Sequence, residues 1–152
     1  MIRRATDRDA EALTGIINRA FAVEKFFIDA DRITLDQVRE FLDKGAFFVA
    51  QDDQIQACIY VELRGERAYF GLLSVEPAYQ RSGLGKQLIA FAENFAREAG
   101  CRFMDINVID LRTELPPIYR KLGYSVSGTS PLPDSIPTKL PCHFIQMTKP
   151  LS

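Results

Sequence analysis

The pattern of apolar and polar positions along the chain predicts four helices. Three of them carry apolar residues three and four positions apart, with polar residues on the opposite face. The fourth is predicted from Pro116 and Pro117, because proline lacks the N–H group that a first helical turn leaves unpaired. The predicted helices span residues 7–21, 35–44, 84–99 and 116–122.

Seven segments between and around these helices are predicted to be strands, with loops and turns of polar residues, glycine and proline between them. Residues 130–141 contain four prolines and are expected to form a loop. The predicted strands span residues 2–5, 46–51, 55–63, 68–75, 102–109, 124–128 and 142–149. The order β-α-α-β-β-β-α-β-α-β-β predicts one mixed α/β domain over residues 1–152.

Composition narrows the class of protein further. The formal net charge of -1 gives no general attraction to nucleic acid or to an anionic membrane surface. No apolar run reaches the roughly 20 residues that cross a bilayer, and the polar N-terminal residues do not form a signal peptide. Cys58, Cys101 and Cys142 are widely spaced and odd in number, which predicts neither a disulfide framework nor a zinc site. We therefore expect a protein of the reducing cytoplasm.

The most informative segment is the turn Gln80–Lys86, between the fourth predicted strand and the third predicted helix. A glycine turn and a helix N-terminus direct several backbone N–H groups toward one place, which favours an anionic phosphate. Gly83 and Gly85 have no Cβ, so a ligand can approach the main chain, and Arg81 and Lys86 add positive charge. The segment predicts a pyrophosphate site, although a simple tight connection fits the turn alone.

The turn differs from two common phosphate-binding motifs. It lacks the Lys-Ser/Thr pair of a P-loop and the third glycine of the dinucleotide fingerprint. It resembles instead the Gln/Arg-x-x-Gly-x-Gly/Ala signature of the GCN5-related N-acetyltransferases (GNAT). Residues 118–124, Ile-Tyr-Arg-Lys-Leu-Gly-Tyr, resemble the second signature of that family, and the order of elements is similar over essentially the whole chain.

The resemblance implies a largely antiparallel sheet of six to seven strands flanked by about four helices. It implies acetyl-coenzyme A as the donor and an amine as the acceptor. The turn would hold the pyrophosphate, and residues 73–75 would pair with the pantetheine arm like an added strand. An N–H group near Leu73 would stabilise the oxyanion of the tetrahedral intermediate. The implied coenzyme-binding residues are Leu73, Ser74, Val75, Gln80, Arg81, Ser82, Gly83, Leu84, Gly85, Lys86, Arg112 and Tyr119.

Two of these residues, Tyr119 and Arg112, each have an alternative role. Tyr119 matches a family tyrosine that lies near the sulfur atom and protonates the departing thiolate; packing against coenzyme A or the sheet is the alternative role. Arg112 stands where many members carry asparagine, so that asparagine's contact with the pantetheine is missing. Arg112 then contacts a phosphate or the acceptor, or is an ordinary solvated residue.

The acceptor amine is protonated at neutral pH, so a base or a water chain must remove a proton before attack. Glu62 and His143 are the candidate bases, with Glu66 and Glu114 as further options. Each of these residues also fits a solvated or half-buried structural position. One histidine and scattered cysteines support neither a Ser-His-Asp triad nor a metal site.

The resemblance places the acceptor between residues 24–32 and residues 129–141. The first segment mixes acidic and apolar side chains, and acidic side chains suit a cationic amine. We predict an N-acetyltransferase that acts on a small amine or on a peptide or protein amine, by direct attack in a ternary complex. A coenzyme A sensor without catalysis is the alternative, and the sequence leaves both a monomer and a homodimer open.

Overall fold

Seven strands form a single sheet in a computed structural model that describes residues 1–151. Their order across the sheet is β1-β2-β3-β4-β5-β7-β6, and all neighbours are antiparallel except β4 and β5, which are parallel. The strands are β1 (Ile2–Arg4), β2 (Ala46–Gln51), β3 (Ile55–Arg64), β4 (Arg67–Val75), β5 (Phe103–Ile109), β6 (Ser125–Pro131) and β7 (His143–Pro150).

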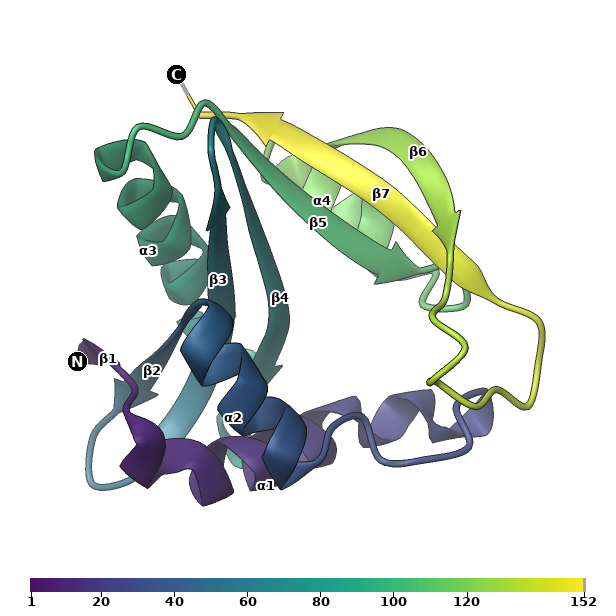
Figure 1. Cartoon of the computed structure of the whole chain (residues 1–152), viewed down its shortest axis with the longest axis horizontal. Helices are drawn as coiled ribbons and strands as arrows, with labels where there is room; N and C mark the ends of the chain where they lie inside the picture. The colour runs from purple at the N-terminus through teal and green to yellow at the C-terminus, as the bar shows by residue number, and fades with distance from the viewer. Residues whose placement is uncertain (152) are drawn as a thin grey trace.

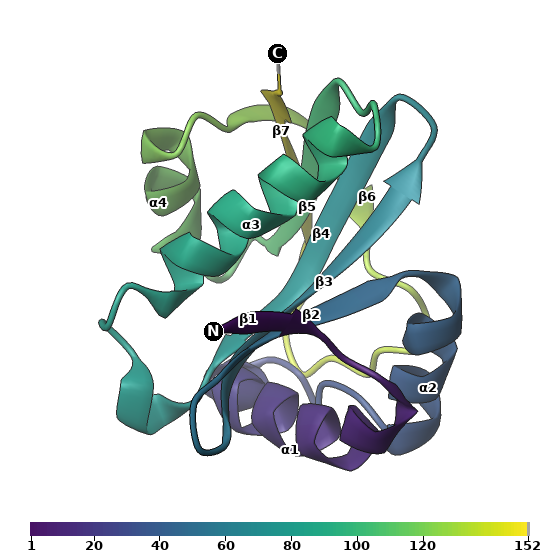
Figure 2. The ribbon, with the colours of Figure 1, turned by 90° about the vertical axis from the view of Figure 1, so that its left-hand side faces the viewer.

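Helices cover both faces of this sheet, with α1 and α2 on one side and α3 and α4 on the other (Figure 2). The helices are α1 (Ala10–Ala20), α2 (Leu35–Lys44), α3 (Leu84–Glu98) and α4 (Leu115–Lys121). Three short 3-10 helices join them, namely η1 (Asp7–Asp9), η2 (Phe21–Phe26) and η3 (Pro77–Tyr79). Within residues 1–151, no helix is both long enough and apolar enough to span a bilayer.

The apolar core has two layers, one on each face of the sheet. Successive strand residues point to opposite faces, so the adjacent Phe47 and Phe48 lie in different layers. Phe47 packs with the fully buried Leu13 of α1, whereas Phe48 packs against Phe91 and belongs to the layer that contains Leu88 of α3. Both faces of the sheet are therefore fixed by side-chain packing.

The sheet opens between β4 and β5. These strands pair only through Arg67–Tyr69 and Phe103–Asp105, whereas β5 pairs with β7 along its whole length. Beyond the three paired residues the two strands diverge into a V (Figure 1). Residues 70–75 of β4 therefore have no strand beside them on the β5 side within the described chain.

A bulge in β4 lies beside this opening. The register between β3 and β4 shifts between Cys58 and Tyr60, and Leu72 has a φ of 53°. A left-handed conformation at a leucine costs on the order of 1 kcal/mol or more. The packing of Leu72, which is only 7% exposed, holds it in place.

The predicted element order and the mixed, largely antiparallel sheet are confirmed, with local differences. The first helix is split into η1 and α1, and η2 was not predicted. Strand β6 continues to Pro131, inside the predicted loop, because Pro131 pairs with His143 of β7. Proline is tolerated there since β6 is an edge strand, whose outer side needs no N–H donor.

Candidate active site

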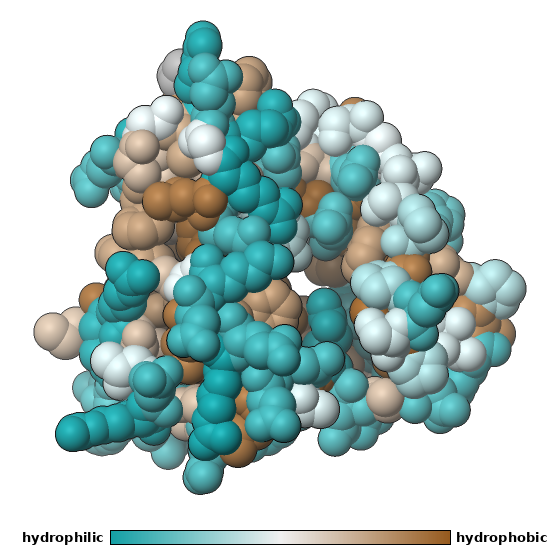
Figure 3. All heavy atoms as spheres, viewed as in Figure 1, coloured by the Kyte–Doolittle hydropathy of each residue, from teal (hydrophilic) through white to brown (hydrophobic). Residues whose placement is uncertain are grey.

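A cavity of about 430 Å³ lies in the opening between β4 and β5. Figure 3 shows the surface hollowed between the two halves of the molecule. Strand β4 supplies Phe70 to Leu73, β5 supplies Ile106 to Ile109, and Tyr119 of α4 lines the same space. Glu24, Arg32 and Arg112 bring charge into the wall of this cavity.

The turn before α3 lies at one end of this region, next to Val75 and Gln80 of the cavity wall. The six backbone N–H groups from Arg81 to Lys86 make no hydrogen bond within residues 1–151. The Ser82 hydroxyl donates to the carbonyl oxygen of Tyr79, and Gln80 Nε2 donates to that of Val75 at 3.3 Å. The turn is thus held by its side chains, while its N–H groups stay available to an anion.

Glycine is needed in this turn for its backbone conformation. Gly83 has a φ of 87°, which side-chain-bearing residues rarely adopt. A Cβ on Gly83 would meet no protein atom within 4 Å, and on Gly85 only ordinary contacts with Val75 and Leu73. The close approach of a ligand to these glycines stays a prediction.

The three residues of β4 that were predicted to pair with pantetheine do not all line the cavity. Leu73 and Val75 line the cavity, whereas Ser74 is 1% exposed and its hydroxyl donates to the carbonyl oxygen of Leu72 at 3.0 Å. Any contact of Ser74 with a ligand would therefore use its main chain.

Tyr119 lies among aromatic side chains in the cavity wall. Its ring lies 6.1 Å from that of Phe70 and 5.9 Å from that of Tyr124, measured between centroids. Its hydroxyl has no hydrogen-bond partner among residues 1–151. Burial raises the pKa of Tyr119 to about 12, against the opposing effect of the nearby Arg112 charge. The phenol therefore stays protonated at neutral pH.

Arg112 is not a solvated residue, because its side chain is 17% exposed and bonded to two carboxylates. Its Nη1 donates to Glu24 Oε2 at 2.9 Å, and its Nε donates to Glu114 Oε2 at 3.0 Å. The guanidinium is thus held in the cavity wall. Direct contact with coenzyme A stays a prediction.

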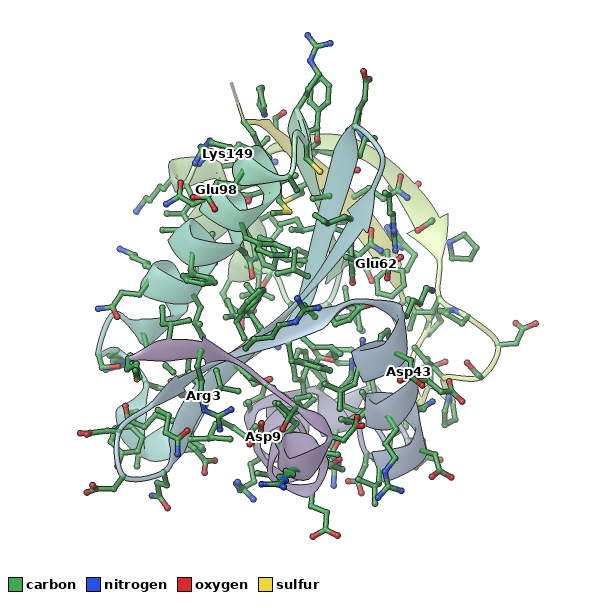
Figure 4. All side chains as sticks on the ribbon, turned by 60° about the vertical axis from the view of Figure 1, so that its left-hand side comes forward. Arg3, Asp9, Asp43, Glu62, Glu98 and Lys149 are labelled. Carbon is green, nitrogen blue, oxygen red and sulfur yellow. The ribbon has the colours of Figure 1, made fainter. Side chains whose placement is uncertain are left out.

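The two leading candidate bases lie outside the cavity walls. Glu62, which is labelled in Figure 4, lies on β3. It accepts a hydrogen bond from Tyr60 Oη at 2.8 Å and one from Arg64 Nε at 2.9 Å. Burial pushes the pKa of Glu62 up, but these two bonds outweigh it and leave the pKa below its usual value. His143 is exposed at the start of β7, with Nδ1 3.4 Å from Asp110 Oδ2. Their roles as bases remain untested.

The two predicted acceptor segments lie against each other. Ile28 and Thr138 form an antiparallel bridge, Asp29 N donates to Pro137 O at 2.9 Å, and Lys139 N donates to Phe27 O at 2.7 Å. A second cavity, of about 330 Å³, is lined by residues of both segments. The two cavities adjoin, because four residues line both of them: Glu24, Arg32, Ile109 and Phe144.

Comparison with known proteins identifies this arrangement. Residues 43–126, more than half of the chain, match the family model described as "Acetyltransferase (GNAT) domain". The chain belongs to the GNAT acetyltransferases. It is 30% identical over 135 residues to the peptidyl-lysine N-acetyltransferase YjaB of Salmonella typhimurium, with 88% of each chain covered. The protein of that name from Escherichia coli is 27% identical, over 88% of this chain and 87% of its own.

Solved structures agree with the GNAT fold. The ribosomal-protein-S18-alanine N-acetyltransferase of Escherichia coli matches all of this chain with a TM-score of 0.80, at 18% identity and 94% coverage of its own chain. YncA of Salmonella typhimurium, solved with its cofactor acetyl-CoA, matches all of this chain with a TM-score of 0.76, at 20% identity and 94% coverage of its own chain. At these identities the likeness shows the fold alone.

Glu24, a charged residue of the cavity wall in this GNAT domain, was not predicted individually. Glu24 is 4% exposed, and its Oε1 has no hydrogen-bond partner among residues 1–151. Burial raises the pKa of Glu24, against the lowering effect of Arg112. The sequence did carry a signal, because Glu24 is an acidic residue within the apolar stretch of residues 20–28.

Proposed function

We propose that this GNAT acetyltransferase transfers the acetyl group of acetyl-coenzyme A to a primary amine by direct attack in a ternary complex. The observation that carries the proposal is the cavity that connects the unpaired edge of β4 to Tyr119. It lies beside a turn whose N–H groups are free. Both features suit one long donor that contains amide groups and a pyrophosphate.

The donor would lie along β4 with its pyrophosphate at residues 81–86. Its pantetheine amides would take the place of a neighbouring strand on residues 73–75, where β5 has diverged. The thioester would then reach the bulge at Leu72, and an N–H group near Leu73 would bond the carbonyl oxygen. YncA, a neighbour of the same fold, is solved with acetyl-CoA, which supports this donor.

The reaction would proceed in one enzyme-bound complex. The neutral amine attacks the carbonyl carbon, a C–N bond forms, and the C–S bond breaks as the tetrahedral intermediate collapses. The thiolate leaves with a proton that Tyr119 donates, and Tyr119 regains a proton from the nitrogen. Direct attack is favoured because no cysteine lines either cavity of the described chain, and burial raises the pKa of the Cys58 thiol to about 12.

The acceptor is proposed to be the amine of a small molecule, or of a peptide or protein. The relative YjaB, a peptidyl-lysine N-acetyltransferase, supports a lysine side chain, a flexible alkyl amine able to enter the second cavity. The cytoplasmic location expected from the sequence stays a prediction, as does the oligomeric state.

Free-thiol release from acetyl-coenzyme A tests this function. We expect thiol release above the background rate with at least one acceptor from a panel of lysine peptides, polyamines, amino acids and aminoglycosides. Acetylation of that acceptor should match the thiol one for one by mass spectrometry. Tight acetyl-coenzyme A binding with no thiol release across the panel would favour the sensor alternative.

A further inference from the structure

The place where the two cavities adjoin carries a carboxylate with one unused oxygen. Glu24 lies on η2 and lines both cavities. Its Oε2 accepts a hydrogen bond from Arg112 at 2.9 Å. Its Oε1 has less than 1 Å² of accessible surface and no donor among residues 1–151.

An unpaired buried carboxylate oxygen is unfavourable, because burial removes its water without replacing the lost hydrogen bonds. Glu24 Oε1 is the only such side-chain atom found in residues 1–151. Other buried carboxylates of the chain are satisfied; Glu93, for example, accepts bonds from Tyr124 at 2.8 Å and Lys149 at 2.9 Å. The unpaired oxygen thus belongs to a residue of the cavity wall.

We propose that Glu24 receives the ammonium group of the acceptor at Oε1 and takes its proton. This inference rests on the proposed acetyl transfer. An acceptor that enters through the second cavity meets Glu24 where that cavity adjoins the one lined by Leu73 and Tyr119. A donor N–H from the substrate then supplies the hydrogen bond that the protein does not.

The proton balance is complete with Glu24 as the base. The ammonium gives one proton to Glu24 Oε1, which makes a neutral amine and a carboxylic acid. The amine attacks the thioester as described above, and its second proton ends on the departing thiol. Glu24 returns its proton to solvent after the products leave, so the net products are the amide, free coenzyme A and one proton.

Burial and the charged neighbours of Glu24 act on its pKa in opposite directions. Arg112 and Arg32 favour its ionised form, whereas burial and Glu114 favour its protonated form, and Cys142 lies close enough to feel its charge. Burial is the strongest of these effects, so the pKa of Glu24 lies above its ordinary value. A carboxylate with a raised pKa is a stronger base than a solvated one.

Glu24→Gln tests the proposal, since glutamine keeps the shape and can still accept from Arg112. We expect kcat/KM for the acceptor to fall about 100-fold or more at pH 7, with acetyl-coenzyme A affinity within about twofold of wild type. In the wild type, kcat/KM should fall as the pH drops through the raised pKa of Glu24, and this acidic limb should be absent from Glu24→Gln. Glu24→Asp should restore part of the rate and the limb.

Glu93→Gln is the matched control, because Glu93 is a buried, ion-paired glutamate that lines neither cavity. It should keep the wild-type rate and pH profile even if its melting temperature falls. Glu24→Gln that keeps its rate within about threefold, or keeps the acidic limb, overturns the role of Glu24 alone. Wild-type protein that acetylates no amine of the whole acceptor panel overturns the proposed function, and the role of Glu24 with it.

Discussion

Arg112 connects the two side chains that we assign to proton transfer. It holds Glu24 through a 2.9 Å hydrogen bond, and its charge lowers the pKa of Tyr119 against the larger effect of burial. A phenol has a higher pKa than a thiol, so it protonates a thiolate only when a neighbouring positive charge lowers that pKa. Asparagine, which the family resemblance leads us to expect at this position, carries no charge and could not lower the pKa of Tyr119 in this way.

Tyr119→Phe should lower kcat about 10- to 100-fold while the KM for acetyl-coenzyme A changes less than about twofold. The ring and its contacts with Phe70 and Tyr124 remain, and the lost hydroxyl had no partner within the described chain. Steady-state kinetics by thiol release would measure both constants. An unchanged kcat would return Tyr119 to a packing role.

Tyr124→Phe is the control for this substitution. The Tyr124 hydroxyl donates to Glu93 at 2.8 Å inside the core, so its loss should cost about 1–3 kcal/mol of unfolding free energy. Turnover should stay at the wild-type level. Comparing the two variants therefore separates a loss of stability from a loss of catalytic rate.

Among the elements, the turn into α3 could be predicted from the sequence, whereas the bulge of β4 could not. The glycines at 83 and 85 made the turn visible in the sequence, and its free N–H groups agree with a phosphate site. The bulge at Leu72 and the positive φ of Arg81 gave no signal, because neither residue is glycine. Local composition shows glycine turns, whereas strain at other residues is imposed by tertiary packing.

Gly83→Glu should weaken acetyl-coenzyme A binding at least tenfold, because it adds a negative charge beside the pyrophosphate and strains a backbone at φ 87°. Calorimetry would measure the dissociation constant. Gly100→Glu is a matched control: Gly100 has a φ of 90° with open space around it, but it lies at the other end of α3. It should lose similar stability and bind normally, and normal binding by Gly83→Glu would mean that the phosphate site is misplaced.

At the scale of the whole molecule, the sequence predicted the element order but not the shape of the sheet. Every predicted strand is present, since period-two patterning and turn residues are local signals. The V between β4 and β5 depends on where two distant strands stop pairing, and no local pattern records that. Glu24 was missed individually for the same reason, because Arg112, which donates a hydrogen bond to it, lies 88 positions away in the chain.

Acetyl-coenzyme A should raise the melting temperature, since it would bind the folded chain and not the unfolded one. At a concentration 100 times its dissociation constant the stabilisation is about 2.7 kcal/mol, or roughly 5–10 °C for a domain of this size. Differential scanning fluorimetry would measure the shift, with Gly83→Glu as the variant that should show little of it. No shift in the wild type would exclude coenzyme binding at that concentration.

The bridge between Ile28 and Thr138 changes the mechanics of the V. Two arms joined only by three parallel residue pairs would swing about that joint. The hydrogen bonds of Phe27 with Lys139 and of Asp29 with Pro137 join the two arms at a second place, without any ligand. We therefore expect these contacts to limit changes in the width of the opening, and with it in the distance between Leu73 and Tyr119.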